Sequence, residues 1–282
     1  MNFEQPKKPS DTEVHTRREL YDKLVARRDA LPREDYPHFF PDADGHYDTL
    51  RGDYKPTEDQ AVVDERIADC KRKKKSILLA DWYKFGVHAT FRDSREEWLK
   101  FINEVDRRHI NNLSYNGIAS LDRFDYRDVS YEWFVQNYEK PNKPCMISGF
   151  SEGWPMNKWT LKTLSENFMK DERVKVGKDN SGYPVRIETK NYVQYCATNK
   201  DDSPVYLFES QLAANPNIAQ IFDNYSRPAW FTNDLFDLVP QTRRPPYRWF
   251  CLGPERSGTT MHYDPLFTNA WNTVIAGRKV WI

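Results

Sequence analysis

The chain lacks the features that mark secreted, membrane-spanning and strongly basic proteins. Its 282 residues carry 42 basic and 42 acidic side chains, so no net charge steers it toward nucleic acid or a membrane surface. No apolar run approaches the length of about 20 residues that a membrane helix needs. The N-terminal residues contain no hydrophobic signal core. We therefore expect an intracellular protein with no membrane association.

Cysteine is also scarce and scattered. The four cysteines include no C-x-x-C pair, so the sequence gives neither a zinc-site spacing nor a disulfide framework. Cys145 and Cys251 lie in apolar, strand-like stretches, where a reduced buried thiol is the ordinary role. Reduced cysteines agree with an intracellular location.

The N-terminal residues differ in composition from the rest of the chain. Residues 1–75 are charged, interrupted by proline and poor in aliphatic side chains, which predicts a partly disordered extension with a helix within 11–29. The basic run at 71–75 has two interpretations: a nuclear-import or polyanion-binding patch, or the solvated face of a helix. As the location within the cell, we favour the nucleus over the cytoplasm.

Helices are predicted in the next part of the chain. Residues 76–125 should form a helical N-terminal region, with its clearest helix at 94–108. There a capping box precedes apolar residues at helical spacing: Ser94 with Glu97, then Trp98, Phe101, Ile102 and Val105. A second helix is predicted to begin at Ser130 and to end before Pro141.

From about residue 126 short strands separated by turns predominate. A hairpin with its turn at 179–182 should join strands at 173–176 and 183–187, and helices are predicted at 160–168 and 191–197. Many short strands separated by Gly and Pro turns favour a sandwich or jelly roll over a doubly wound fold. The other predicted strands lie at 145–148, 205–208, 248–252, 259–263, 270–275 and 279–282.

The residues that carry chemistry begin with His262 and Asp264. Because side chains alternate along a strand, a His-x-Asp pair on a strand presents both side chains on one face. One imidazole nitrogen and one carboxylate oxygen are two-thirds of the two-histidine, one-carboxylate set that holds non-haem Fe(II). No histidine follows His262 to supply the third ligand. A lone histidine is also common as a hydrogen-bonded core residue, so its surroundings must decide.

Lys279 favours the metal-site interpretation. It lies in an apolar stretch, where a lysine either points to solvent or supplies a cation to a pocket. An iron oxygenase that uses 2-oxoglutarate needs such a cation for the distal carboxylate of this cosubstrate. Asn272 and Thr259 could add neutral hydrogen bonds to the same pocket.

The C-terminal part of the chain carries a series of short motifs. They are PPYRWF at 245–250, GPxRSGT at 253–259, HxDPL at 262–266, AWN at 270–272 and GxKxW at 277–281. In this order they closely resemble the jumonji-C (JmjC) oxygenases, and most of all the phosphatidylserine-receptor-like branch of bifunctional arginine demethylases and lysyl hydroxylases. The resemblance extends back to about residue 125. It implies an α+β, mainly β fold: an incomplete double-stranded β-helix (cupin, jelly-roll, JmjC) over 126–282, with the C-terminal strands missing.

The resemblance also implies a role for each matching residue. His262 and Asp264 become the metal ligands, with no catalytic residue beyond the metal site. Trp249 becomes a wall of the active site, although a core position is the alternative. The cosubstrate contacts implied are Lys279, Asn272, Thr259 and Tyr206, of which Tyr206 could equally be ordinary strand packing.

The implied activity is that of an Fe(II)- and 2-oxoglutarate-dependent dioxygenase. Such an enzyme uses O2 to hydroxylate lysyl side chains of a protein substrate or to demethylate methyl-arginine. Since the second ligating histidine of the family lies after the lysine, we expect this chain to be an incomplete product with little turnover. The alternative is a non-catalytic cupin-like protein-interaction module. Nucleic-acid binding through 71–75 and 243–244 is the least supported function, because the net charge is zero.

Overall fold

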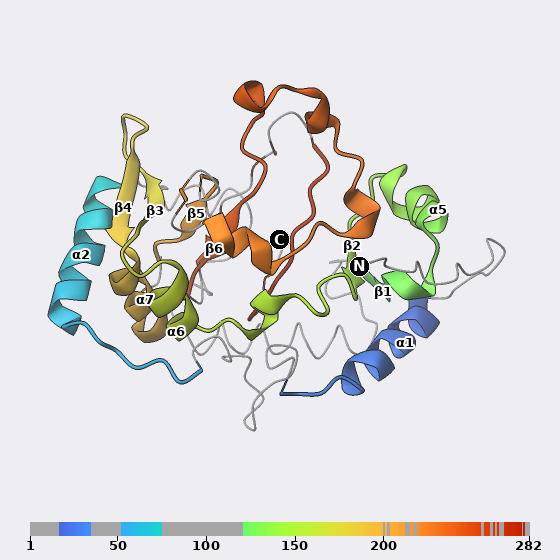
Figure 1. Ribbon diagram of the computed structural model, residues 1–282, viewed down its shortest axis with the longest axis horizontal. Helices are drawn as coiled ribbons and strands as arrows, with labels where there is room; N and C mark the ends of the chain where they lie inside the picture. Colours follow the sequence, from blue (N-terminus) through green and yellow to red (C-terminus); the bar gives the residue numbers. More distant parts are fainter. Residues whose placement is uncertain are drawn as a thin grey trace, which may run out of the picture.

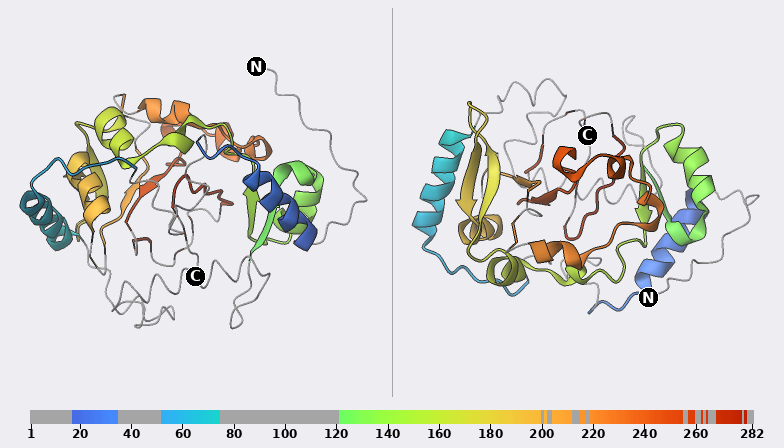
Figure 2. Two further views of the ribbon diagram at one scale, coloured as in Figure 1. Left: turned by 90° about the horizontal axis from the view of Figure 1, so that it is seen from below. Right: turned by 45° about the horizontal axis from the view of Figure 1, so that its top comes forward.

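The computed structural model describes residues 17–34, 52–74 and 121–279, the last range with gaps at 200, 202–203, 212–214, 217–218, 255–256, 260–261, 263, 265–267 and 278. Figures 1 and 2 show two groups of helices and small sheets at opposite ends of the molecule, with C-terminal residues between them. Among the described residues, no helix has the length and apolar character needed to cross a membrane.

The larger group is built on the predicted hairpin. Strands β3 (Arg173–Lys178) and β4 (Pro184–Glu188) pair antiparallel, with an irregularity between Lys175 and Gly177. The Asp179 carboxylate closes the turn by accepting hydrogen bonds from the backbone N–H groups of Ser181 and Tyr183, both at 2.9 Å. Turn chemistry of this kind is what favours Asp at the start of a tight turn, and the hairpin prediction is confirmed.

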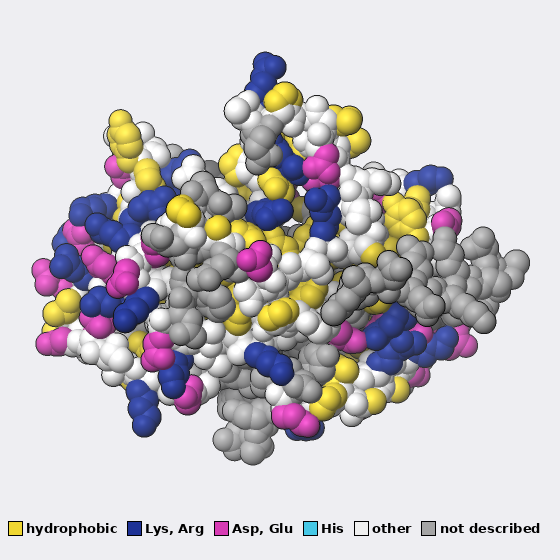
Figure 3. Space-filling view, in the orientation of Figure 1, with side chains coloured by type: hydrophobic (Ala, Val, Ile, Leu, Met, Phe, Trp, Pro, Cys, Tyr) yellow, Lys and Arg dark blue, Asp and Glu magenta, His cyan; other side chains and the backbone are white. Residues whose placement is uncertain are grey.

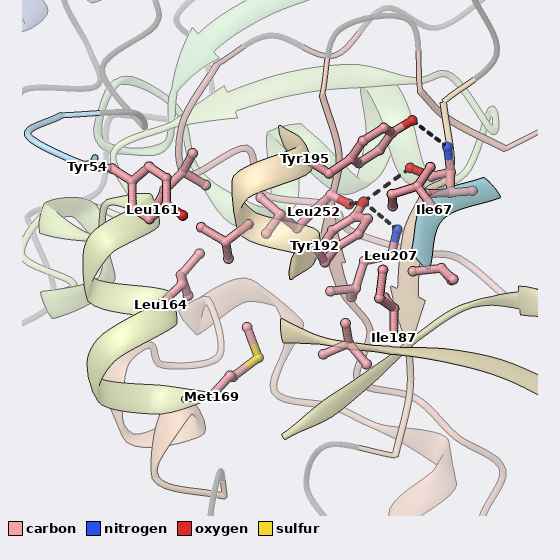
Figure 4. Packing of buried hydrophobic residues seen from close by; sticks show 14 of the residues in the cluster. Tyr54, Ile67, Leu161, Leu164, Met169, Ile187, Tyr192, Tyr195, Leu207 and Leu252 are labelled. Atoms are coloured by element: carbon pink, nitrogen blue, oxygen red, sulfur yellow. Dashed lines mark hydrogen bonds between the residues drawn. The ribbon is translucent and has the colours of Figure 1, made fainter. Parts of the chain in front are cut away.

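One hydrophobic core joins this hairpin to helices far away in the sequence (Figure 4). Val174 and Val176 of β3 point into the core, as do Val185 and Ile187 of β4, as expected from alternation along each strand. Three helices cover the hairpin and the neighbouring sheet: α2 (Gln60–Lys73), α6 (Leu161–Thr163) with its π-helical continuation η7 (Leu164–Phe168), and α7 (Thr189–Thr198).

The start of α2 is fixed by a side chain of α7. The Gln194 side chain is 1% exposed, and its oxygen accepts hydrogen bonds from the backbone N–H groups of Thr57 (3.1 Å) and Glu58 (2.9 Å). Its amide nitrogen donates to the Glu58 carbonyl at 2.9 Å. Val63 and Ile67 of α2 are buried in the same core as the hairpin. Residues 52–74 therefore form part of the larger group.

The tyrosine at the centre of the core holds a second sheet in place. Strands β5 (Leu207–Glu209) and β6 (Phe250–Leu252) pair antiparallel, with Leu207 opposite Leu252. The fully buried Tyr192 hydroxyl donates to the Leu252 carbonyl at 2.6 Å and accepts from the Leu207 N–H at 2.9 Å (Figure 4). One hydroxyl thus satisfies a backbone group on each strand and attaches both strands to α7.

The smaller group contains a parallel pair of strands. Strands β1 (Asp122–Asp125) and β2 (Cys145–Ser148) are connected by α5 (Tyr131–Phe134) and its π-helical continuation η5 (Val135–Glu139). Helix α1 (Arg17–Asp29) packs on β1, and Arg27 forms an ion pair with the Asp128 carboxylate just after that strand. A second core lies between these elements: Leu20, Phe124, Val129, Phe134 and Tyr138.

Most of the predicted elements are confirmed. The helix beginning at Ser130 forms, with the Ser130 hydroxyl accepting from the Trp133 N–H at 3.0 Å. The strand at 145–148 and the helices at 160–168 and 191–197 also form, and α1 lies within the helix predicted at 11–29. The strands at 205–208 and 248–252 are shorter than predicted. The helix predicted at 94–108 lies outside the described residues.

The strand predicted at 270–275 is wrong. These residues are described and have no regular secondary structure. A strand exists only when its backbone pairs with a neighbour, and here the chain is held by side chains instead: Trp271 stacks on Phe231 with ring centroids 6.4 Å apart. The described residues of the strands predicted at 259–263 and 279–282 are Thr259, His262 and Lys279, and none of them is in a strand.

The basic run is engaged in contacts within the molecule. Lys71 forms an ion pair with Asp201 at 2.6 Å, and Lys73 forms one with Asp69 at 2.5 Å. The aliphatic part of the Lys74 side chain packs against Gly177: a Cβ added at Gly177 would lie 2.8 Å from Cγ of Lys74. For residues 71–74 these contacts favour the helix-face interpretation over a free polyanion-binding patch.

Removing the Tyr192 hydroxyl should destabilise the fold. Tyr192→Phe leaves the Leu207 N–H and the Leu252 carbonyl buried without that partner, so we expect the free energy of unfolding to fall by about 2 kcal/mol. Urea denaturation measures this change. Tyr183→Phe is the matched control, because the Tyr183 side chain is 70% exposed and its loss of a hydroxyl should change stability by less than about 0.5 kcal/mol. Equal stability of the two variants would contradict the role of Tyr192.

Candidate functional site

The candidate site lies on the face of β5 and β6 that points away from the core. Leu207 and Leu252 face the core. Because side chains alternate along a strand, the cross-strand pair Phe208 and Cys251 lies on the opposite face. We call this side the open face. Side chains two positions before Phe208 and Cys251, those of Tyr206 and Trp249, are expected on the same face.

Aromatic rings cover one end of the open face. Trp249 stacks on Phe208 with ring centroids 4.2 Å apart, and Phe208 in turn lies 6.2 Å from the Tyr206 ring. Trp249 is 44% exposed and is absent from the hydrophobic core. This placement disagrees with the core alternative for Trp249, and its role as an active-site wall stays a prediction.

Lys175 adds a positive charge beside this wall. Its Nζ lies 5.8 Å from the centre of the Trp249 ring. Burial lowers the pKa of Lys175, while the buried Glu209 carboxylate acts in the opposite direction. Glu209 itself is held by Arg186 at 2.9 Å. Lys175 was not among the predicted site residues, although the valines on either side of it in β3 predict that it points away from the core.

Tyr206 lies beside β6, where its ring is close to Gly253. Burial is the main cause that raises the Tyr206 pKa, so this hydroxyl stays neutral and remains a donor. Burial raises the pKa of the Cys251 thiol on the open face of β6, while the positive charge of Lys279 acts to lower it.

Gly253 allows Tyr206 to lie so close to the strand. A Cβ at this position would lie 2.7 Å from Cδ2 of Tyr206 and 2.0 Å from the hydroxyl oxygen of Ser257. Ser257 is fixed in turn, since its hydroxyl donates to the Pro254 carbonyl at 2.6 Å. Contacts this short are not seen for real Cβ atoms, so glycine is needed here for close packing.

His262 and Asp264 are neighbours in space as well as in sequence. The Nε2 atom of His262 lies 3.5 Å from Oδ1 of Asp264, and both side chains are about half exposed, at 49% and 48%. Ligand bonds of about 2.0–2.2 Å place two donors of one ion at a comparable separation. The pair therefore fits a divalent metal ion, although the described residues contain no cluster of three His, Cys, Asp or Glu.

Thr259 and Asn272 are the other two residues predicted to bind the cosubstrate. Both side chains are exposed. Their predicted contacts with a cosubstrate stay predictions.

Comparison with known proteins shows what the chain is similar to. No protein-family model matches the chain. It is 40% identical over 164 residues to the bifunctional arginine demethylase and lysyl-hydroxylase psr-1 of Caenorhabditis elegans, covering 58% of this chain and 41% of the relative. It is 35% identical over 157 residues to the arginine-specific demethylase JMJ22 of Arabidopsis thaliana, covering 55% and 29%. The 2-oxoglutarate and iron-dependent oxygenase JMJD4 of Danio rerio is 30% identical over 176 residues, covering 55% and 41%.

These relatives belong to the JmjC class, which includes proteins named as 2-oxoglutarate and iron-dependent oxygenases. Within that class, the predicted resemblance to the phosphatidylserine-receptor-like branch is confirmed, and the chain is a relative of that branch. The chain spans about two-fifths of the length of the psr-1 proteins that it matches.

Adding a methyl group at position 253 should destabilise the packing around Tyr206. Gly253→Ala drives a Cβ into Tyr206 and Ser257, and overpacking of this kind costs about 1–3 kcal/mol in the free energy of unfolding. Gly258→Ala is the matched control, because nothing lies within 4 Å of its Cβ position. Chemical denaturation compares the two variants. A Gly253→Ala protein as stable as Gly258→Ala would mean that Tyr206 does not pack against this glycine.

Proposed function

We propose that this chain belongs to an Fe(II)- and 2-oxoglutarate-dependent oxygenase that hydroxylates lysyl side chains of a protein substrate or demethylates methyl-arginine. The observation that carries the proposal is the His262–Asp264 pair, whose Nε2 and Oδ1 atoms lie 3.5 Å apart, in a chain that also supplies Tyr206 and Lys279. A neutral hydroxyl donor and a lysine cation suit a carboxylate, and the His–Asp pair suits iron. The names of the relatives support the same chemistry.

In this proposal each residue of the chain has a physical role. His262 and Asp264 hold the metal ion through one nitrogen and one oxygen. Lys279 pairs with the distal carboxylate of 2-oxoglutarate, and the Tyr206 hydroxyl donates a hydrogen bond to it. When bound, iron would activate O2, which is the oxidant, and 2-oxoglutarate would supply two of the electrons that reduce it. The stacked rings of Trp249 and Phe208 form a wall that limits access of water to the pocket.

The fold that we propose for residues 126–282 is part of a double-stranded β-helix. The three two-stranded sheets of the described residues are compatible with such a fold, and the relatives support it. For the location of the protein we propose the nucleus, which microscopy of a fluorescently tagged chain would test.

A non-catalytic protein-interaction module is the second candidate, and a projecting segment favours it. Leu235 and Leu238 are 80% and 83% exposed on the 3-10 turn η11 (Leu235–Leu238), in a segment that projects from the body (Figures 1 and 3). Arg244 braces this turn by ion pairs with Asp234 and Asp237. Exposed leucines held on a rigid turn are suited to contact with another protein.

Binding of 2-oxoglutarate separates the two candidates. Calorimetric titration of 2-oxoglutarate into the full chain with Mn(II) in place of Fe(II) should give saturable binding, and Lys279→Ala should weaken it at least about ten-fold because the carboxylate loses its charged partner. Lys178→Ala, an exposed lysine at the end of β3, is the control and should bind like the wild type. Absence of 2-oxoglutarate binding would sink the oxygenase proposal and leave the interaction module.

A further inference from the structure

Lys175 is a cation that the proposed function does not use. It lies in the middle of β3, and the valines on either side of it face the core. Strand β3 lies beside β5, which pairs with β6 (Figure 1). This arrangement brings the Lys175 ammonium group over the Trp249 ring, with Nζ 5.8 Å from the ring centre. A cation within about 6 Å of a tryptophan ring is attracted to the face of that ring.

The basic residue opposite Lys175 is paired with a carboxylate. Arg186 lies opposite Lys175 in the register of β3 and β4, and it forms an ion pair with Glu209 at 2.9 Å. The other oxygen of Glu209 accepts hydrogen bonds from the backbone N–H groups of Ser210 and Gln211, at 3.1 and 3.2 Å. Both oxygens of this buried carboxylate therefore already have partners.

Lys175 differs from Arg186 in having no such partner. Within the part of the chain that the structure describes, no carboxylate forms an ion pair with the Lys175 ammonium group. The side chain is nevertheless only partly exposed, and burial lowers its pKa. A partly buried charge attracts an opposite charge more strongly than a fully exposed one does, because less water screens it.

The aromatic ring beneath this ammonium group is itself available to a partner. Trp249 is 44% exposed, and its ring stacks on Phe208 with centroids 4.2 Å apart. The Trp249 ring attracts the lysine without neutralising its charge. A side chain that is already restrained also loses less conformational entropy when it binds a ligand. Lys175 and Trp249 together therefore offer a cation and an exposed aromatic surface to an anion.

We propose that Lys175 and Trp249 form a subsite for an acidic side chain of the protein substrate, with its carboxylate paired to the Lys175 ammonium group and its methylene groups on the Trp249 ring. The inference rests on the proposed function, since it takes a protein as the substrate. One cation suits one carboxylate, whereas a nucleic acid needs several cations along its backbone. Lys175 also repels lysyl and arginyl side chains, so the subsite takes a residue other than the target.

Protection from acetylation tests the placement directly and needs no turnover. The full chain with Mn(II) and 2-oxoglutarate is treated with an acetylating reagent, and labelling of each lysine is followed by mass spectrometry. The probe is an N-acetylated peptide with one methyl-arginine flanked by aspartates, and its control peptide has asparagines instead. We expect the aspartate peptide to slow labelling of Lys175 at least about five-fold, and the asparagine peptide less than about two-fold. Labelling of Lys178, an exposed lysine of the same strand, should not change.

Two variants of Lys175 test its role in recognition. Fluorescence anisotropy should show that the wild-type chain binds the aspartate peptide about five-fold more tightly than the asparagine peptide. Lys175→Gln should reduce this preference to less than about two-fold, whereas Lys175→Arg keeps the charge and should preserve it. Lys178→Gln is the matched control and should bind both peptides like the wild type. Unchanged melting temperatures and unchanged binding of 2-oxoglutarate separate these effects from loss of folding.

The outcomes are distinguishable. If 2-oxoglutarate binds in calorimetry but the aspartate peptide neither protects Lys175 nor binds better than the asparagine peptide, this inference is overturned and the proposed function stands. Protection of Lys175 by 2-oxoglutarate alone, or by an oligouridylate RNA and not by the peptide, also overturns the inference. If 2-oxoglutarate does not bind to the wild-type chain at all, both are overturned. Selective protection of Lys175 over Lys178, together with the retained preference of Lys175→Arg, supports the inference.

Discussion

The hydrogen bonds of the Tyr192 hydroxyl determine where the candidate site can form. This buried group bridges β5 and β6 to α7 and sets which face of the two strands is turned to the core. The open face, with Tyr206 and Cys251 on it, is the consequence. A polar atom in a core requires partners, and here those partners are backbone groups of the two strands that carry the site. Stability and site geometry therefore depend on the same few atoms.

Local signals in the sequence were sufficient for most of the larger group. The β3–β4 turn was predictable because an Asp side chain closes it, and the helix after Ser130 because a hydroxyl caps it. Strand β1 was missed because Asp122–Asp125 is short and polar at both ends, so it has no alternating pattern. The strand expected at 270–275 had the right composition, but composition cannot supply a neighbouring backbone to pair with.

In the candidate site too, residues marked by a local pattern were predictable, and contacts across strands were not. His262 and Asp264 were found from a spacing of two residues, and Tyr206, Lys279 and Trp249 from the resemblance to the JmjC proteins. Lys175 and the packing of Gly253 against Tyr206 were not predicted, because each matters only through a neighbour on another strand or segment. Register across a sheet is set by the whole core, and a single sequence does not display it.

The contact between Gln194 and the start of α2 has a consequence for how the chain folds. It joins residues that are 136 positions apart, and the core behind it closes only with Leu252 of β6. During synthesis at roughly 5–20 residues per second, the segment that becomes α2 waits on the order of ten seconds for its partner to leave the ribosome. Its apolar stripe of Val63 and Ile67 is exposed for that whole interval. Production of this protein in a cell should therefore depend on chaperones that cover a nascent helix, more than on the speed of any local step.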